Sequence, residues 1–243
     1  MSLEDSPLAR KLGAFVALSE QELSVLQGFH QRRKTFETGR DLVLQGQLGH
    51  AAYILAEGWV CSYKLLPGGS RQIVDFQIPG DFLGLRSMLF RTSDHSIEAM
   101  TKIEVSEVSG DDLMDAFSKT PRLATAVLWA ASRDEAMVVE HLVDVGRRSA
   151  LERTAHFLLE LGARLKLVGL ATLEGYDCPL SQYLLADALG LSAVHLNRVL
   201  RQLRERGLLT FRNGHVTFNN FEQLLVIASF DTAYLDQDGP LLR

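Results

Sequence analysis

The chain has 243 residues, of which 47% are hydrophobic and 23% are charged. A chain of this length can bury a sizeable core, which we expect to be divided between two domains. The two cysteines, Cys61 and Cys178, lie far apart and form no CxxC spacing, which argues against an iron–sulfur cluster, a structural zinc ion or a disulfide framework. The sequence has neither the pattern of a signal peptide nor the ~18 apolar residues of a membrane span, so we expect a cytoplasmic protein without a membrane partner.

The net charge of −5 is distributed unevenly along the chain. Residues 1–146 contain 14 Lys and Arg against 20 Asp and Glu, a net of −6, whereas residues 147–243 contain 11 against 10, a net of +1. Within residues 198–212, five arginines stand against a single acid, Glu205. Because the local field governs contact with phosphate, this basic stretch can bind nucleic acid even in an acidic protein.

Residues 42–109 have the pattern of an all-β domain. Short apolar runs alternate with turn signals such as Pro67–Gly69 and Pro79–Gly80. Strands at this spacing predict a barrel or a sandwich. Before them, Ser19 and Glu22 have the spacing of a capping box and predict a helix from Ser19 to Leu26.

The hydrophobic period changes after the strands. Pro121 can open a helix, and neither proline nor glycine interrupts the chain from there to about Val143. Two adjacent stripes run along this helix, the first being Leu123, Val127, Ala130, Met137 and His141, and the second Leu128, Ala131, Val138 and Leu142. We expect one stripe to pack on the barrel and the other on a partner helix, the alternative being a simple core helix. Asp144–Gly146 is interpreted as a hinge, followed by a second helix over residues 148–165.

Two short helices joined by a tight turn are predicted next. Ser181 is the expected N-cap of the first, Gly190 allows the sharp turn that ends it, and Ser192 caps the second. The core face of the second helix is formed by Leu196, Val199, Leu200 and Leu203, and the opposite face by Val194, Arg198, Arg201 and Glu205. This is the pattern of a helix-turn-helix, in which the second helix enters the major groove of DNA.

Asn213-Gly214 between alternating residues predicts a hairpin, which would form the wing of a winged helix-turn-helix. The alternative is an ordinary helical hairpin with a solvated arginine face, but turn, caps, outward arginines and wing together favour DNA binding. We expect Arg198 and the first turn of the second helix to meet base edges, and Arg201 and the backbone at Ser192 to meet phosphates. The predicted DNA-binding residues are Ser181, Gln182, Ser192, Ala193, Val194, His195, Asn197, Arg198, Arg201 and Arg212.

The order of these elements resembles that of the catabolite-activator and fumarate–nitrate-reduction (Crp/Fnr) family of bacterial regulators over nearly the whole chain. LVLQGQLGHAAYILAEG (42–58) is similar to the family's cyclic-nucleotide-domain signature, with Gly46, Gly49 and Gly58 at its glycine positions. LSQYLLADALGLSAVHLNRVLRQLRERGLL (180–209) is similar to the family's helix-turn-helix, with Arg198 at the position of a base- or phosphate-contacting arginine.

The resemblance implies an α+β fold in two domains. Residues 1–146 would form a cyclic-nucleotide-binding-type β-barrel (jelly roll) with a dimerisation helix at about 121–143, and residues 147–243 a winged helix-turn-helix. It also implies a homodimer that binds double-stranded DNA at a roughly palindromic operator and senses a signal in the barrel. RNA polymerase would be a partner if the protein activates transcription.

The resemblance places the effector site at Gly84, Leu85, Arg86, Ser87, His95, Ser96 and Val138. In cyclic-AMP-binding relatives, a glutamate that accepts from the ribose stands at Leu85, and an arginine that neutralises the phosphate stands at His95. Leucine cannot accept a hydrogen bond, and histidine is a poor replacement for a bidentate guanidinium, so Arg86 is the nearby cation that could compensate. Val138 and Val139 stand where relatives have adenine-contacting hydroxyls. We therefore expect an effector other than cyclic AMP in its usual mode, and its identity stays open.

Other departures bear on function. The N-terminal cysteine cluster of Fnr-like relatives has no counterpart, because the first cysteine is Cys61, and no metal site is predicted. No cofactor is assigned, and whether the protein senses haem or a redox signal stays open. No P-loop, zinc-protease or nucleophile-elbow motif occurs, so we do not expect an enzyme. Val194 stands where the family commonly has glutamate, which favours apolar contact, for example with a thymine methyl, and predicts a different operator. The second hypothesis is a ligand-sensing module that acts through protein contacts and has a degenerate helix-turn-helix.

Overall fold

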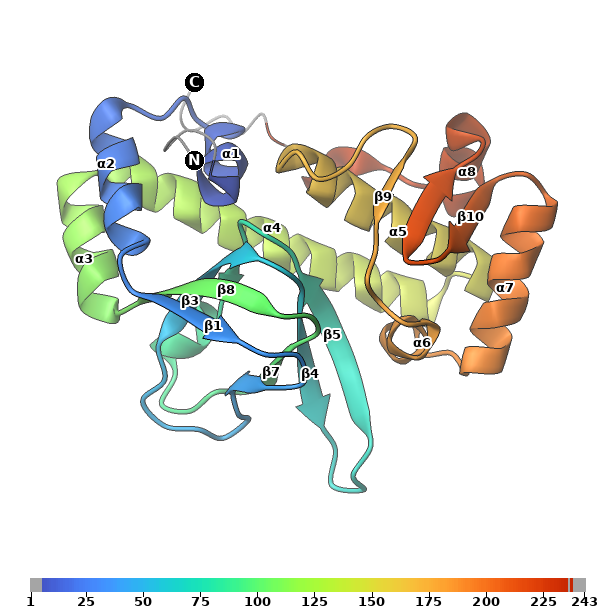
Figure 1. The fold of residues 1–243 in the computed structure, drawn as a ribbon, viewed down its shortest axis with the longest axis horizontal. Helices are drawn as coiled ribbons and strands as arrows, with labels where there is room; N and C mark the ends of the chain where they lie inside the picture. The colour runs from blue at the N-terminus through green and yellow to red at the C-terminus, as the bar shows by residue number, and fades with distance from the viewer. Residues whose placement is uncertain (1–5, 236, 238–243) are drawn as a thin grey trace. The chain divides into compact units, whose positions relative to one another are not determined.

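A computed structural model describes residues 6–235 and residue 237 of the chain. The contacts divide the described residues into two compact units, one extending to Asp134 and one comprising Glu135–Leu235. The long helix α4 (Pro121–Gly146; Figure 1) contributes residues to both units, because the division at Asp134 falls within it. The domain boundary expected after residue 146 stays a prediction.

Two four-stranded antiparallel sheets form the barrel of the first unit. The first sheet has the order β1 (Arg33–Phe36), β8 (Ile103–Val108), β3 (Ala52–Glu57), β6 (Phe82–Leu83). The second sheet has the order β2 (Asp41–Val43), β7 (Ser96–Ala99), β4 (Val60–Leu65), β5 (Arg71–Gln77). The β-rich segment expected over residues 42–109 is confirmed. Strand β1 was not expected, because its sequence RKTF is largely exposed and lacks an apolar run.

Strand β3 shows why the barrel needs apolar residues on both faces. Tyr53 and Leu55 belong to the core between the two sheets, whereas Ile54 belongs to a second core under the helices. Side chains alternate across a strand, so both sides of β3 are buried. The following turn requires Gly58, which has a φ of 86°, because a Cβ there would lie 2.5 Å from the carbonyl oxygen of Lys102.

Helices cover the outer side of the sheet that contains β3. They are α1 (Pro7–Gly13), α2 (Glu20–Phe29), α3 (Gly110–Lys119) and the first part of α4. The capping box of Ser19 and Glu22 is confirmed, and α2 continues three residues beyond Leu26. From the first predicted stripe of α4, Leu123, Val127 and Ala130 are buried in this core.

The second predicted stripe of α4 is exposed. Leu128 is 65% exposed and Leu142 is 72% exposed, and Val138, Val139 and Val143 are exposed as well. The predicted hinge is wrong in its position, because Asp144–Gly146 form the last turn of α4. The helix breaks at residues 147–149, where Ser149 starts α5 (Ala150–Leu167) with a capping box of its own.

The second unit contains a helix-turn-helix and a wing packed around α5. Helices α6, α7 and α8 all contact α5. A three-stranded sheet of order β10-β11-β9 forms the wing. The bounds are α6 (Gln182–Leu189), α7 (Ala193–Glu205), β10 (Leu209–Arg212), β11 (His215–Phe218), β9 (Gly175–Asp177), α8 (Phe221–Ala228) and the 3-10 helix η3 (Thr232–Leu235). The predicted hairpin is confirmed, and β9 was not expected.

Candidate DNA interface and effector site

Three residues set the ends of α6 and the start of α7. The Ser181 hydroxyl accepts a hydrogen bond from the backbone nitrogen of Leu184 at 3.3 Å, and the Ser192 hydroxyl accepts one from that of His195 at 3.2 Å. Gly190 ends α6 with a φ of 61°, in the left-handed region that favours glycine. The predicted caps are confirmed, and they fix the direction in which α7 starts.

Helix α7 has one buried face and one exposed face. Leu196, Val199, Leu200 and Leu203 are buried, as the sequence predicts. On the opposite side Val194 is 73% exposed, and Arg198 and Arg201 are exposed as well. An apolar side chain at this level of exposure, next to two cations, is available to a partner molecule rather than to the core.

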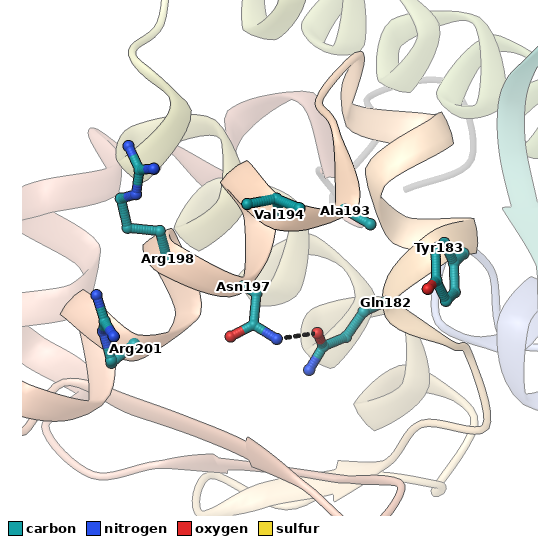
Figure 2. A pocket seen from close by; sticks show the side chains of 7 residues that line it. All are labelled: Gln182, Tyr183, Ala193, Val194, Asn197, Arg198 and Arg201. Atoms are coloured by element: carbon teal, nitrogen blue, oxygen red, sulfur yellow. Dashed lines mark hydrogen bonds between the residues drawn. The ribbon is translucent and has the colours of Figure 1, made fainter.

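A shallow hollow of about 500 Å³ lies on this exposed face (Figure 2). Its lining consists of Gln182, Tyr183, Ala193, Val194, Asn197, Arg198 and Arg201. The structure thus brings six predicted DNA-binding residues together. Tyr183, which is 75% exposed, was not among the residues predicted from the sequence. An aromatic residue on the first helix but outside its apolar face was a signal that could have identified it.

The remaining predicted DNA-binding residues do not line the hollow. Ser181 and Ser192 are the caps, and His195 is exposed in the first turn of α7. Arg212 is exposed at the end of β10, where it pairs with His215 across the hairpin. The turn residues Asn213 and Gly214 have φ values of 52° and 71°, as an Asn-Gly hairpin turn requires.

Three of the predicted effector residues, Arg86, Ser87 and His95, contact a carboxylate that the sequence did not single out, that of Asp94. Arg86 Nη2 donates to Asp94 Oδ2 at 2.9 Å, and His95 Nδ1 lies 2.8 Å from Asp94 Oδ1. The Ser87 hydroxyl donates to Asp94 Oδ1 at 3.4 Å, and Lys64 Nζ lies 4.0 Å from Oδ2. A carboxylate therefore stands among the groups expected to hold an anion.

Asp94 is ionised at neutral pH. Burial acts to raise the pKa of its carboxyl group, but the hydrogen bond from His95 and the charge of Arg86 outweigh burial and bring the pKa below its usual value of 3.8. The positive charge of Arg86 is therefore balanced within the chain.

The other predicted effector residues have structural contacts of their own. Leu85 packs, partly buried, against the core under the helices, which accounts for an apolar residue at that position. The buried Ser96 hydroxyl accepts a hydrogen bond from the backbone nitrogen of Gln45 at 3.0 Å. Gly84 has a φ of 71° at the turn after β6. Val138 lies in the second unit, on the exposed stripe of α4.

Neither cysteine has the surroundings of a reactive thiol. Cys61 and Cys178 are both buried, and burial raises the pKa of each thiol to about 12. Among the described residues, no group of three or more His, Cys, Asp or Glu side chains is placed to hold a metal ion. No helix in the described part of the chain is long and apolar enough to cross a membrane.

Comparison with known proteins agrees with this architecture. Residues 33–120 match the family described as the cyclic nucleotide-binding domain, and residues 152–227 match the Crp-like helix-turn-helix domain. A cyclic-nucleotide-binding-type barrel followed by a winged helix-turn-helix defines a DNA-binding transcription regulator. The chain belongs to the Crp/Fnr family of bacterial regulators.

Its relatives are transcription regulators. The chain is 32% identical over 187 residues to the nitrogen fixation regulation protein FixK of Bradyrhizobium diazoefficiens, which covers 76% of this chain and 77% of that protein. It is 31% identical to a probable transcriptional activator of Rhizobium leguminosarum, over 86% of this chain and 85% of that protein. The solved structure of FixK2 from Bradyrhizobium japonicum has a TM-score of 0.72 at 28% identity, covering 80% of this chain and 96% of that one.

Proposed function

We propose that this protein is a homodimeric regulator that binds a roughly palindromic DNA operator through α7 and is controlled by a signal received in the barrel. The observation that carries this proposal is the exposed face of α7, where Val194, Asn197 and Arg198 stand on a helix with a fixed, capped start. In helix-turn-helix proteins this part of the second helix meets base edges. RNA polymerase is a further partner if the protein activates transcription.

We assign roles to the DNA-facing residues by their chemistry. Base edges are read by side chains of the first turns of α7, namely Ala193, Val194, Asn197 and Arg198. Phosphates are met by the remaining polar groups of the two helices and the wing, namely Ser181, Ser192, His195, Arg201 and Arg212. Gln182 lines the same hollow beside Asn197. The cap at Ser192 leaves backbone N–H groups at the start of α7 that favour an anion.

The proposed dimer uses the exposed stripe of α4. Leu128, Val138 and Leu142 are large apolar side chains that stay exposed to solvent in the single chain. A second copy of the helix would remove them from water and would set two α7 helices to read half-sites about 34 Å apart. In this proposal the sensor and the DNA-binding domain divide after residue 146.

For the barrel, we infer an effector other than cyclic AMP bound in the usual way. The phosphate of a cyclic nucleotide would meet Arg86 beside the carboxylate of Asp94, a group of its own sign that already balances the charge of Arg86. Leu85 offers no acceptor for a ribose hydroxyl and contributes to the core instead. Of the predicted effector residues in the barrel, Gly84, Ser87, His95 and Ser96 remain candidates for contact with another ligand.

Operator binding at graded salt concentrations tests the DNA-binding proposal. An operator selected from random DNA should bind more tightly than unselected DNA, and the logarithm of the binding constant should fall linearly with the logarithm of salt concentration, by about 0.9 for each phosphate contacted. The competing hypothesis, a module that acts through protein contacts, predicts no DNA affinity even at low salt. That result would overturn the proposal.

Calorimetric titration with cyclic AMP tests the proposal for the barrel. We expect no heat of binding up to millimolar nucleotide. Saturable binding in the micromolar range would overturn our reading of Leu85, His95 and Asp94.

A further inference from the structure

A hydrogen bond fixes the amide of Asn197 in the middle of the exposed face of α7. Asn197 Nδ2 donates to Gln182 Oε1 at 2.9 Å, so the bond joins the two helices of the helix-turn-helix. An amide oxygen cannot donate, so only one of the two orientations of the Asn197 side chain satisfies Gln182 Oε1. Figure 2 shows the consequence, with the Asn197 carbonyl oxygen turned away from Gln182.

The fixed amide keeps one acceptor and one donor free. Oδ1 can accept, and the second hydrogen on Nδ2 can donate. In the major groove, adenine presents a matching pair, because N6 donates and N7 accepts. Guanine presents two acceptors on the same edge, and cytosine presents only a donor, so neither satisfies both atoms.

The neighbours of Asn197 place it where a base would be read. It follows Ala193 and Val194 by one helical turn and precedes Arg198, and all four line the hollow on the exposed face. An apolar surface beside an amide and a guanidinium offers three different kinds of base contact along one helix.

We propose that Asn197 reads an adenine in each operator half-site and that Gln182 is the positioning residue that holds its amide in the reading orientation. The proposal rests on the proposed DNA-binding function and names one base of the operator. Gln182 acts through Asn197, because its Oε1 accepts from Nδ2 and so favours the amide orientation that turns Oδ1 toward the base.

The first experiment removes single atoms from the DNA. In a selected operator, each adenine is replaced in turn by 7-deazaadenine, which lacks the N7 acceptor, and by 3-deazaadenine as a control, which changes only a minor-groove atom. We expect one adenine per half-site at which 7-deazaadenine weakens binding of the parent about fivefold, roughly half of a bidentate contact in free energy. The same replacement should leave the Asn197→Ala variant unaffected. Absence of such an adenine, or an equal loss in the variant, overturns the proposal.

The second experiment separates positioning from phosphate contact. The readout is the ratio of affinities for the adenine operator and for the operator with guanine at that position. Gln182→Ala should lower this ratio roughly threefold, the worth of one hydrogen bond. Gln182→Glu keeps an acceptor for Asn197, so it should preserve the ratio while weakening binding to both operators through its negative charge.

The matched control is Gln202→Ala, which removes an exposed glutamine of α7 outside the hollow and should change neither quantity. If Gln182→Ala weakens both operators equally, Gln182 contacts phosphate and does not position Asn197. If the parent binds no DNA, the proposed function fails together with this inference. If the parent selects an operator and Asn197→Ala keeps the full ratio, only the inference fails.

Discussion

His141 of α4 donates a hydrogen bond to Glu160 of α5, with 2.9 Å between Nε2 and Oε1, although the Glu160 side chain is fully buried. The Tyr234 hydroxyl donates to the other carboxylate oxygen at 2.9 Å, and Arg164 Nη1 lies 3.8 Å from Oε1. A buried carboxylate is tolerated only when it is paired and hydrogen-bonded. These contacts hold the end of α4, helix α5 and the C-terminal η3 together in the second unit.

The Glu160 cluster predicts a loss of stability in acid. Burial acts to raise the pKa of Glu160, but the charge and hydrogen bond of His141, with Arg164 and Tyr234, outweigh it and bring the pKa below the usual 4.5. A carboxyl group with a lowered folded-state pKa stabilises the fold above its unfolded pKa, and this contribution is lost as the pH falls below about 4.5. Glu160→Gln should lower the free energy of unfolding by about 3 kcal/mol at pH 7, and by less as the pH falls from 5 to 3.

Urea unfolding followed by circular dichroism at several pH values checks this. The control is Glu174→Gln, which removes an exposed glutamate of the same unit and should change little at any pH. A difference between parent and Glu160→Gln that stays constant from pH 7 to pH 3 would contradict the role given to the charge.

Substitution of Arg198 can tell whether this side chain reads a base or contacts a phosphate. If it reads guanine bidentately, Arg198→Ala should cost about 1–3 kcal/mol on the operator and little on random DNA. If it meets a phosphate, both affinities fall and the salt slope decreases by about 1. Fluorescence anisotropy with both DNAs at several salt concentrations measures these quantities.

The control for Arg198 is Arg206→Ala, at the C-terminal end of α7 and about 12 Å further along the helix. It removes the same charge from the chain without touching the hollow. If Arg198→Ala binds operator and random DNA as the parent does, the assignment of Arg198 is wrong.

Local signals explain why the helix-turn-helix was predictable. Ser181, Gly190 and Ser192 each act within a few residues of chain, and the core face of α7 follows from the helical period alone. The contact between Asn197 and Gln182 was not predictable in the same way, because it depends on how α6 and α7 cross.

The barrel shows the opposite case. Arg86 and His95 were found through a family pattern, but the pattern did not include Asp94, whose role comes from the fold of the loop between η2 (Arg86–Leu89) and β7. The predicted hinge was wrong for a similar reason. Gly146 can end a helix as well as bend a chain, and the capping box of Ser149 decided where the next helix starts.

Removing the charge of Asp94 should make the barrel more receptive to an anion. In Asp94→Asn, Arg86 and Lys64 no longer face a carboxylate, and a phosphate group meets two unbalanced cations. We expect calorimetry to show cyclic AMP binding to Asp94→Asn at nucleotide concentrations where the parent gives no heat, and this binding should weaken with added salt.

The control for the barrel is Asp115→Asn, an exposed aspartate of α3 that pairs with Lys119. It makes the same change in net charge away from the effector residues. Equal gains in the two variants would mean that net charge, rather than the contact of Asp94 with Arg86, limits binding.

The exposed apolar stripe of α4 predicts which substitution would separate the proposed dimer. Leu142 is 72% exposed within one chain, and Leu128 and Val138 lie on the same stripe. Leu142→Glu would bury a charge between two copies of the helix, which costs several kcal/mol, so the variant should sediment as a monomer at concentrations where the parent is a dimer. Val226→Glu places the same charge on a similarly exposed apolar residue of α8, 78% exposed, and should leave the oligomeric state of the parent unchanged.

Because a palindromic operator needs two α7 helices, the Leu142→Glu monomer should also lose operator affinity while keeping weak, salt-sensitive binding to random DNA. A Leu142→Glu protein that stays dimeric would place the dimer contact elsewhere than on this stripe.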